Sequence, residues 1–151
     1  MTSFAALGVI PALTEVLNKQ GIKVAPPVQE KAIPAIFKGR DVIAKSQTGT
    51  GKTLAYLLPL VQRIQTERDE VQALILTPTR ELSKQVFDVL KSLASVRGVD
   101  AADVIGGRTI ENQIQKLKRN PHVIIGTPGR LLDHIRRRTL DLSAVKMVIL
   151  D

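Results

Sequence analysis

A glycine-rich stretch at Ser46–Thr53, SQTGTGKT, contains the residue types that bind phosphate groups. Its glycines allow the backbone to turn tightly and to approach phosphate oxygens without a Cβ atom in the way. Successive backbone N–H groups and the N-terminus of a following helix then form a cradle for anions. Lys52 is placed to reach the β- and γ-phosphates of a nucleotide, and the hydroxyl of Thr53 is placed to coordinate Mg²⁺. The predicted nucleotide-binding residues of this loop are Ser46, Gln47, Thr48, Gly49, Thr50, Gly51, Lys52 and Thr53.

Ser46 occupies the outer position of the loop, where the general phosphate-loop pattern has glycine. This position needs only a small residue that is compatible with the turn, so serine does not exclude phosphate binding. The alternative interpretation is a glycine-rich turn that merely caps a helix. We favour phosphate binding because a predicted strand at residues 41–45 precedes the loop and a predicted helix at residues 52–64 follows it.

The composition is that of a folded domain. The chain has 151 residues, of which 44% are hydrophobic and 24% are charged, and this is enough for one domain with a core of its own. It has no apolar run long enough to span a membrane and no signal-peptide pattern at its N-terminus. The absence of cysteine excludes disulfides and thiolate metal sites. We expect a cytoplasmic protein.

The chain is strongly basic, with a net charge of +8. A basic domain of this size often binds a polyanion, although solubility alone is an alternative reason for the charge. Aromatic residues make up only 3% and tryptophan is absent, so a stacking platform for single-stranded bases is not expected. Any nucleic acid would therefore be held by its backbone.

Apolar segments alternate with amphipathic segments along the chain, which predicts alternating strands and helices. We expect helices at residues 10–20, 28–37 (with an irregularity at Pro34), 52–64, 80–93, 109–118 and 128–138. We expect strands at residues 41–45, 72–76, 102–105, 122–125 and 146–150. The strands are near-continuous apolar runs, which is typical of parallel strands covered on both faces. Right-handed crossovers would place helices on both sides, so we predict a three-layer α/β fold with a parallel sheet.

Four further short motifs accompany the glycine-rich loop. They are GIKVAPPVQ at residues 21–29, PTRELSKQ at residues 78–85, the pair Gly106–Gly107, and TPGR at residues 127–130. Together and in this order, the five motifs resemble the first RecA-like P-loop NTPase domain of DEAD-box RNA helicases. The resemblance extends from Phe4 to Asp151 and implies ATP, Mg²⁺ and RNA as ligands. We expect one domain over residues 1–151, with a Q-motif-like segment at about 4–29 and the core at about 30–151.

The resemblance implies that residues 21–29 are the adenine-reading Q motif. Gln29 would hydrogen-bond the adenine edge, because an amide offers one donor and one acceptor. Phe4 matches the isolated upstream aromatic of the family. Ile22 stands where the family usually has an aromatic residue on the base, and Pro26 stands where it usually has threonine, so adenine selectivity could be looser. The alternative is that Gln29 and Phe4 only cap and pack an N-terminal helix.

The resemblance also implies a groove for the RNA backbone. PTREL and TPGR place backbone N–H groups and threonine hydroxyls at helix N-termini, where phosphates bind well. Such contacts carry no base information, so binding is expected to be independent of sequence. The predicted RNA-binding residues are Pro78, Thr79, Arg80, Glu81, Gly106, Gly107, Thr127, Pro128, Gly129 and Arg130. The alternative is structural: Arg80 and Glu81 could form internal salt bridges that shape the loop, and Gly106, Gly107 and Gly129 could serve only as turns.

Asp151 follows an apolar strand, where the second motif of the family begins. The resemblance implies that Asp151 helps to hold Mg²⁺ through water and acts with Lys52 and Thr53 in catalysis. The glutamate that follows this aspartate in the family, and the second RecA-like domain with its arginine fingers, are not in these 151 residues. We therefore expect a truncated chain that binds ATP or ADP without turnover. An exposed strand edge at its end would favour self-association.

Other interpretations remain open at this stage. The chain could be a nucleotide-binding module that never acts on RNA, or part of a superfamily 2 DNA helicase. A small-molecule kinase explains SQTGTGKT but leaves PTREL and TPGR unexplained. Arg136–Arg138 is best interpreted as a solvated C-terminal turn of a helix. His122 and His134 lack ligand partners at metal-site spacing and are interpreted as ordinary surface or core residues.

Overall fold

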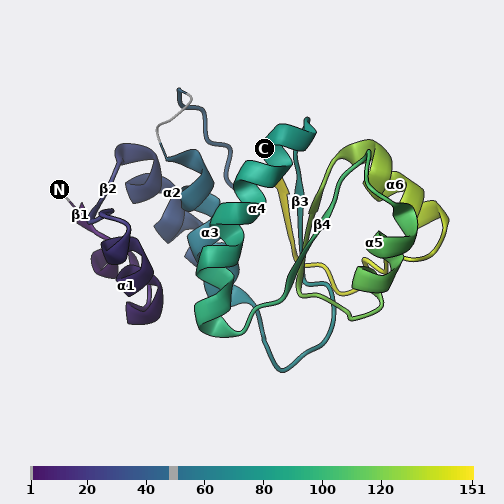
Figure 1. Ribbon diagram of the computed structural model, residues 1–151. Helices are drawn as coiled ribbons and strands as arrows, with labels where there is room; N and C mark the ends of the chain where they lie inside the picture. Colours follow the sequence, from purple (N-terminus) through teal and green to yellow (C-terminus); the bar gives the residue numbers. More distant parts are fainter. Residues whose placement is uncertain (1, 48–50) are drawn as a thin grey trace. The chain divides into compact units, whose positions relative to one another are not determined.

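The computed structural model describes residues 2–47 and 51–151, and it divides into two compact units (Figure 1). The N-terminal unit is Met1–Arg63 and the C-terminal unit is Ile64–Asp151. None of the helices in the described part of the chain is long and apolar enough to cross a membrane.

Helices dominate the N-terminal unit. They are α1 (Pro11–Lys19), α2 (Pro27–Phe37) and α3 (Lys52–Arg63), and the short strands β1 (Thr2–Ser3) and β2 (Val24–Ala25) pair antiparallel. α1 and α2 both have proline in their first turn, where its missing N–H costs no helical hydrogen bond. α2 runs on through Pro34 without a break, and α2 packs against α3.

The end of α3 fixes the N-terminal segment. The side chain of Gln62 accepts a hydrogen bond from the backbone N–H of Ile10 at 3.0 Å and donates one to the carbonyl of Gly8 at 2.9 Å. Arg63 donates to the carbonyl of Ile36 at 2.9 Å, which ties the end of α3 to the end of α2. Phe4 is buried nearby in the chain, in the segment that leads into a 3-10 turn. These contacts hold the segment that the sequence associates with adenine.

The strand predicted at residues 41–45 is wrong. These residues have no strand conformation, and the side chain of Ile43 is fully exposed. A strand exists only as part of a hydrogen-bonded ladder. Among the described residues, the parallel ladders connect only the four strands of the C-terminal unit.

A parallel sheet forms the centre of the C-terminal unit. Its order is β4-β5-β3-β6. The strands are β3 (Ala73–Leu76), β4 (Ala101–Val104), β5 (Val123–Gly126) and β6 (Met147–Leu150). Ala73 of β3 lies beside Val123 of β5 on one side and Met147 of β6 on the other. The two central strands are almost fully buried, as the uninterrupted apolar runs predict.

Helices cover both faces of this sheet, so the predicted three-layer arrangement is confirmed (Figure 1). α4 (Arg80–Ala94) contacts β4 and β5, and its buried face includes Val86, Leu90 and Leu93. α5 (Ile110–Leu117) and α6 (Pro128–Arg136) lie on the other side. Their residues Leu117 and Leu131 join a core cluster with side chains of β3, β4 and β5.

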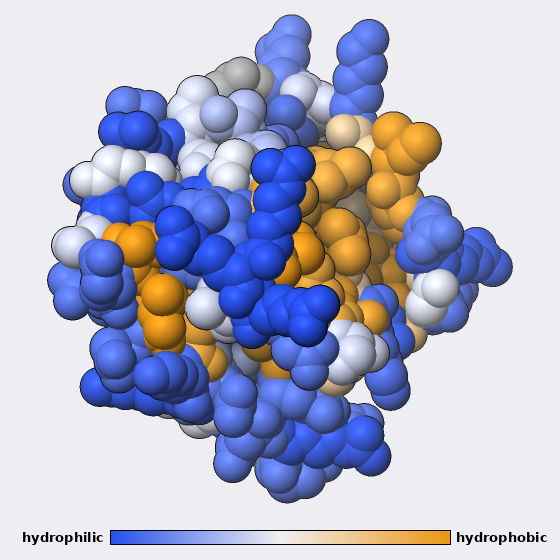
Figure 2. Space-filling view, turned by 90° about the vertical axis from the view of Figure 1, so that its right-hand side faces the viewer, coloured by the Kyte–Doolittle hydropathy of each residue, from blue (hydrophilic) through white to orange (hydrophobic). Residues whose placement is uncertain are grey.

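β6 leaves apolar surface uncovered. Val148 and Leu150 are 57% and 79% exposed. Their register beside Leu74 and Leu76 places them on the same face as the core cluster of α5 and α6. Figure 2, which views the side of the molecule with these two helices, shows hydrophobic surface next to hydrophilic side chains. The expected self-association of the chain stays a prediction, and this surface would favour it.

Gly126, the last residue of β5, is a position where only glycine fits. A Cβ atom there would collide with the carbonyl oxygen of Val104 and come within 3.1 Å of the Leu131 side chain. Gly126→Ala should therefore lower the free energy of unfolding by about 1–3 kcal/mol. Urea denaturation of the 151-residue chain measures this change.

Gly129→Ala is the matched control, because a Cβ atom at Gly129 meets nothing within 4 Å. It should not lower the free energy of unfolding, and could raise it by up to about 1 kcal/mol because alanine favours the helix more than glycine does. Equal stabilities of the two variants would contradict the close approach at Gly126.

Candidate functional site

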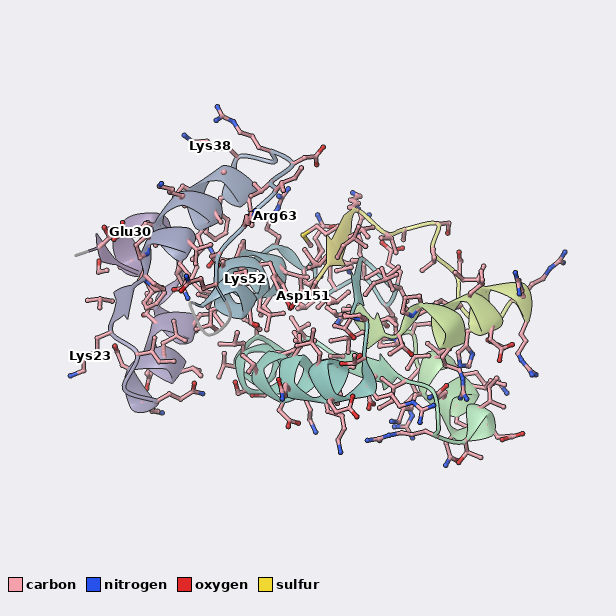
Figure 3. The ribbon with its side chains drawn as sticks, turned by 90° about the horizontal axis from the view of Figure 1, so that it is seen from above. Lys23, Glu30, Lys38, Lys52, Arg63 and Asp151 are labelled. Atoms are coloured by element: carbon pink, nitrogen blue, oxygen red, sulfur yellow. The ribbon has the colours of Figure 1, made fainter. Side chains whose placement is uncertain are left out.

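The end of the glycine-rich loop lies against the segment that precedes α2. Gly51 has a positive φ of 93° and directly precedes Lys52, the first residue of α3 (Figure 3). A Cβ atom at Gly51 would lie 2.5 Å from Nε2 of Gln29 and 2.9 Å from the ring of Pro26. Glycine is therefore required here for both conformation and space.

Gln29 is held in one orientation by this loop. Its Nε2 donates a hydrogen bond to the carbonyl of Gly51 at 2.9 Å. Its Oε1 is buried and has no hydrogen-bond partner among the described residues. A buried acceptor without a donor is costly, so a ligand that brings an N–H group fits this site. The exocyclic amino group of adenine is such a donor, and the arrangement therefore fits an adenine nucleotide.

The other residues expected to bind the nucleotide differ in exposure. Ser46, Lys52, Thr53 and Ile22 are partly exposed and Gln47 is exposed. Phe4 is only 3% exposed. Thr48, Gly49 and Thr50 lie outside the described residues. The contacts of all these residues with a nucleotide stay predictions.

Pro26 is the N-cap residue of α2, and it makes no side-chain cap. Its carbonyl accepts hydrogen bonds from the N–H groups of Gln29 at 3.0 Å and Glu30 at 3.1 Å. The first turn of α2 is thereby formed although Pro26 has no hydroxyl, and the ring of Pro26 packs next to Gly51. The residue that departs from the family pattern thus still supports Gln29.

Thr53 and Asp151 offer a hydroxyl and a carboxylate, which are the hard oxygen ligands that Mg²⁺ prefers. Phosphate oxygens of a nucleotide would supply further ligands. Thr53 belongs to α3 in the N-terminal unit, and Asp151 directly follows β6 in the C-terminal unit. The residue types therefore fit a magnesium nucleotide.

The remaining motifs all follow strands of the parallel sheet. Because parallel strands end at the same edge, their loops lie side by side in the order of the strands. That order places Gly106–Gly107 first, then TPGR, then PTREL, and then Asp151. Two backbone hydrogen bonds join neighbouring strand ends, from Thr77 N–H to the Gly126 carbonyl and from Asp151 N–H to the Leu76 carbonyl, both at 3.0 Å. The predicted RNA-binding residues are thus brought together along one edge.

Arg80 lies against the glycine pair. A Cβ atom on Gly107, whose φ is +82°, would collide with Nη1 of Arg80, and one on Gly106 would lie 3.3 Å from Nη2. The guanidinium is therefore packed on the bare backbone of Gly106–Gly107. Among the described residues, neither Arg80 nor Glu81 forms a salt bridge, so Arg80 shapes the loop by packing rather than by an ion pair.

Arg130 holds the same loop from another side. Its Nη1 donates to the carbonyl of Arg108 at 2.8 Å and to Oε1 of Gln113 at 3.1 Å. The Nε2 of Gln113 donates to the carbonyl of Ile105 at 2.8 Å. The segment Ile105–Arg108, which we call the GG loop, is therefore held by α4, α5 and α6.

Gln113 is a site residue that the sequence motifs do not include. It occupies an apolar position of α5, in the stripe formed with Ile110, Ile114 and Leu117, and it is only 2% exposed. The sequence signal that could have identified Gln113 is its position as a polar residue within an apolar helical stripe.

The two threonines of the motifs begin helices. The Oγ1 of Thr79 accepts a hydrogen bond from the N–H of Leu82 at 3.1 Å, which caps α4 and leaves the hydroxyl proton to be donated. Thr127 precedes α6 and makes no side-chain cap there, so its hydroxyl does not occupy the N–H groups of the first turn. Thr79, Gly107 and Gly129 belong to exposed positions along the edge. A phosphate backbone can approach all three.

His134 is a core residue with both ring nitrogens bonded. Its Nε2 lies 2.8 Å from Oε1 of Gln113, and its Nδ1 lies 2.8 Å from the hydroxyl of Thr139. Since Nε2 of Gln113 donates to Ile105, the Gln113 oxygen faces His134, and the imidazole Nε2 carries the hydrogen. Burial lowers the pKa of His134, the nearby charges of Arg130 and Arg137 lower it further, and Asp133 raises it.

Two further expectations are confirmed. The Nδ1 of buried His122 accepts a hydrogen bond from the N–H of Asp100 at 2.9 Å, so this histidine belongs to the core. The basic cluster Arg136–Arg138 is exposed at the end of α6, and Arg137 pairs with Asp133 at 2.9 Å. Among the described residues, no group of three or more His, Cys, Asp or Glu side chains could hold a metal ion.

Known proteins are similar to this chain in both sequence and fold. A family model described as DEAD/DEAH box helicase matches residues 26–151. The chain is 46% identical to the ATP-dependent RNA helicase CshA of Listeria monocytogenes and 44% identical to the DEAD-box ATP-dependent RNA helicase CshA of Geobacillus kaustophilus. Both alignments cover 100% of this chain but 29% and 32% of those relatives, so the chain spans about three-tenths of their length.

Solved structures lead to the same class of fold. A DEAD box protein from the hyperthermophile Methanococcus jannaschii matches with a TM-score of 0.94 at 36% identity, over 100% of this chain and 41% of that chain. S. cerevisiae Dbp5 bound to RNA and ADP BeF3 matches with a TM-score of 0.90 at 33% identity, over 100% of this chain and 38% of that chain. The fold is therefore that of a RecA-like α/β domain. Within this class, the chain belongs to the DEAD/DEAH box helicase family.

The lowered pKa of His134 predicts how stability depends on pH. The unfolded chain binds a proton near the ordinary histidine pKa of 6.5, whereas the folded chain binds it only at lower pH. The free energy of unfolding should therefore decrease as the pH falls below about 6.5, and stop decreasing below the folded pKa. Urea denaturation between about pH 8 and pH 5 measures this contribution.

His134→Gln is the comparison variant, because glutamine retains a donor and an acceptor but does not titrate in this range. The variant should lose part of the pH dependence of the parent. A slope that is identical in both proteins would show that His134 does not resist protonation.

Proposed function

We propose that this chain is the N-terminal ATP- and RNA-binding part of an ATP-dependent DEAD-box RNA helicase. The observation that carries the proposal is the contact between motifs that are far apart in the sequence. Arg80 of PTREL packs on Gly106–Gly107, and Arg130 of TPGR bonds the carbonyl of Arg108 next to them. A phosphate-loop protein with another chemistry has no need for these three loops to be joined.

The nucleotide is proposed to bind at the N-terminal unit. Gln29 would accept a hydrogen bond from adenine through its Oε1, which has no partner among the described residues. The hydrogen bond from Gln29 Nε2 to the carbonyl of Gly51 holds the amide in the orientation that this requires. Lys52 would neutralise the β- and γ-phosphates, and Thr53 and Asp151 would hold Mg²⁺, the latter through water. The bound metal would neutralise charge on the phosphates.

The RNA is proposed to bind along the edge of the sheet in the C-terminal unit. The hydroxyl of Thr79, the open N-terminus of α6 and the exposed glycines present donors to phosphate oxygens. Binding would be independent of base sequence, as expected for a chain with few aromatic residues. In the longer protein, a second RecA-like domain would close on both ligands, and hydrolysis would be coupled to local unwinding of a duplex.

Substitutions in the two units should separate the two ligands. Thr79→Val removes the hydroxyl that would be donated to a phosphate, and it should weaken binding of a short single-stranded RNA by roughly tenfold. Lys52→Ala should abolish ATP binding and leave RNA binding without nucleotide unchanged. Fluorescence anisotropy with labelled RNA and with a labelled adenine nucleotide measures both affinities.

Thr79→Ser is the matched control, because serine retains both the cap of α4 and the hydroxyl proton. It should bind RNA like the parent. If Thr79→Val and Thr127→Val leave RNA affinity unchanged while ATP still binds, the chain is a nucleotide-binding module instead. Equal or tighter binding of single-stranded DNA than of RNA in the longer protein would favour a DNA helicase.

The 151-residue chain by itself should bind ATP without hydrolysing it. The family's water-activating glutamate and the arginines of a second domain are not among its residues. Phosphate release in the presence of RNA should therefore not exceed the rate measured without protein. RNA-stimulated hydrolysis by the 151-residue chain would refute this proposal.

A further inference from the structure

We infer that Gln113 is a positioning residue for RNA binding, which sets the GG loop against the beginning of α6 and is itself held by His134. This inference rests on the proposed function, since it assigns the residue that shapes the proposed groove. Gln113 belongs to none of the family motifs quoted above.

The side-chain amide of Gln113 has a single orientation that satisfies its neighbours. Its oxygen accepts from His134 Nε2 at 2.8 Å and from Arg130 Nη1 at 3.1 Å, while its nitrogen donates to the Ile105 carbonyl at 2.8 Å. A rotated amide would direct its N–H groups at two donors and its oxygen at a carbonyl. Because the side chain is only 2% exposed, water cannot compensate for such a loss.

The three bonds connect both loops that flank the proposed groove. Ile105 directly precedes Gly106, and Arg130 is the last residue of TPGR. The same guanidinium nitrogen of Arg130 also bonds the carbonyl of Arg108, directly after Gly107. The amide of Gln113 therefore fixes the start of the GG loop and, through Arg130, its end.

His134 extends this network to the far end of α6. Its buried ring accepts from the Thr139 hydroxyl at Nδ1 and donates to Gln113 at Nε2. The N–H and the hydroxyl of Thr139 both lie within hydrogen-bond distance of the His134 carbonyl, at 3.0 and 3.1 Å, and the hydroxyl also lies 2.8 Å from the ring Nδ1, so Thr139 fixes the imidazole from one side. His134 thus prevents the Gln113 oxygen from turning away from Arg130.

The network runs from the buried side chains of Gln113 and His134 to exposed loop residues. Gly107 and Arg108 are exposed, whereas α5 is anchored to the core cluster separately by Leu117. Loss of the Gln113 amide should therefore shift the GG loop without unfolding the sheet. This separates a positioning role from a purely structural one.

The test uses Gln113→Leu, which keeps the side-chain size and removes all three hydrogen bonds. We expect RNA affinity of the 151-residue chain to fall roughly tenfold, with adenine-nucleotide affinity within about twofold of the parent. Gln115→Leu is the matched control, because Gln115 is an exposed glutamine on the same helix. It should bind both ligands like the parent.

A second readout does not depend on RNA. In the parent, the ring ¹⁵N shifts of His134 should show a neutral imidazole protonated at Nε2. In Gln113→Leu, the backbone amide signals of Gly106 and Gly107 should move while those of β3 and β5 stay in place. Gly106 and Gly107 signals that do not move would overturn the inference.

Gln113→Glu separates the two halves of the amide. The carboxylate still accepts from His134 and Arg130, but it cannot donate to the Ile105 carbonyl. We expect this variant to keep the hydrogen on His134 Nε2 and still lose RNA affinity. If Gln113→Leu does not fold, Gln113→Glu decides, and parental RNA affinity in that variant overturns the inference.

The outcomes distinguish this inference from the proposed function. If the parent binds RNA and Thr79→Val weakens it, but Gln113→Leu does not, only the positioning role of Gln113 is refuted. If the parent does not bind RNA at all, the proposed function fails and this role fails with it. Weakened RNA binding by both Thr79→Val and Gln113→Leu supports both.

Discussion

The parallel hydrogen-bond ladder of β4-β5-β3-β6 is the constraint on which the rest of the C-terminal unit depends. Each parallel strand must be followed by a crossover, so each strand end leads through a loop toward the next element. Here three of these loops open into α4, α5 and α6, whose positive N-terminal ends therefore collect along one edge. Gly126 lets β5 approach β4 at that edge. The anion binding proposed for this edge thus has a basis in topology before any basic side chain is considered.

The basic side chains of the motifs have a different role from the one that charge alone indicates. Arg80 packs on glycine backbone, and Arg130 bonds a carbonyl and an amide oxygen. Both guanidinium groups thereby shape the loops, and the proposed phosphate contacts fall to backbone N–H groups and threonine hydroxyls. Planar guanidinium suits this task because it makes several directed hydrogen bonds and also packs by its face. Arg80 and Arg130 thus add positive charge to this edge and also order the GG loop.

Most helices and strands could be predicted from the sequence because their signals are local. Proline at the first turns of α1, α2 and α6 and the apolar runs of β3 and β5 determine those elements within a few residues. Residues 41–45 were predicted wrongly because a short apolar run does not specify a partner strand. Gln113 and His134 were missed as site residues because their bonds join positions 21 residues apart in the chain. Only the fold brings such side chains together.

The packing of Arg80 on Gly107 also limits how this protein can vary during evolution. Any side chain at Gly107 would occupy the space of the guanidinium and would require a positive φ that other residues rarely adopt. A smaller residue at position 80 would leave space for a side chain at position 107, but the GG loop would lose the guanidinium that packs on it. The two positions, which are separated by a whole helix and a strand, are therefore coupled. A change at Gly107 would therefore require a change at position 80 as well as a residue that accepts the positive φ.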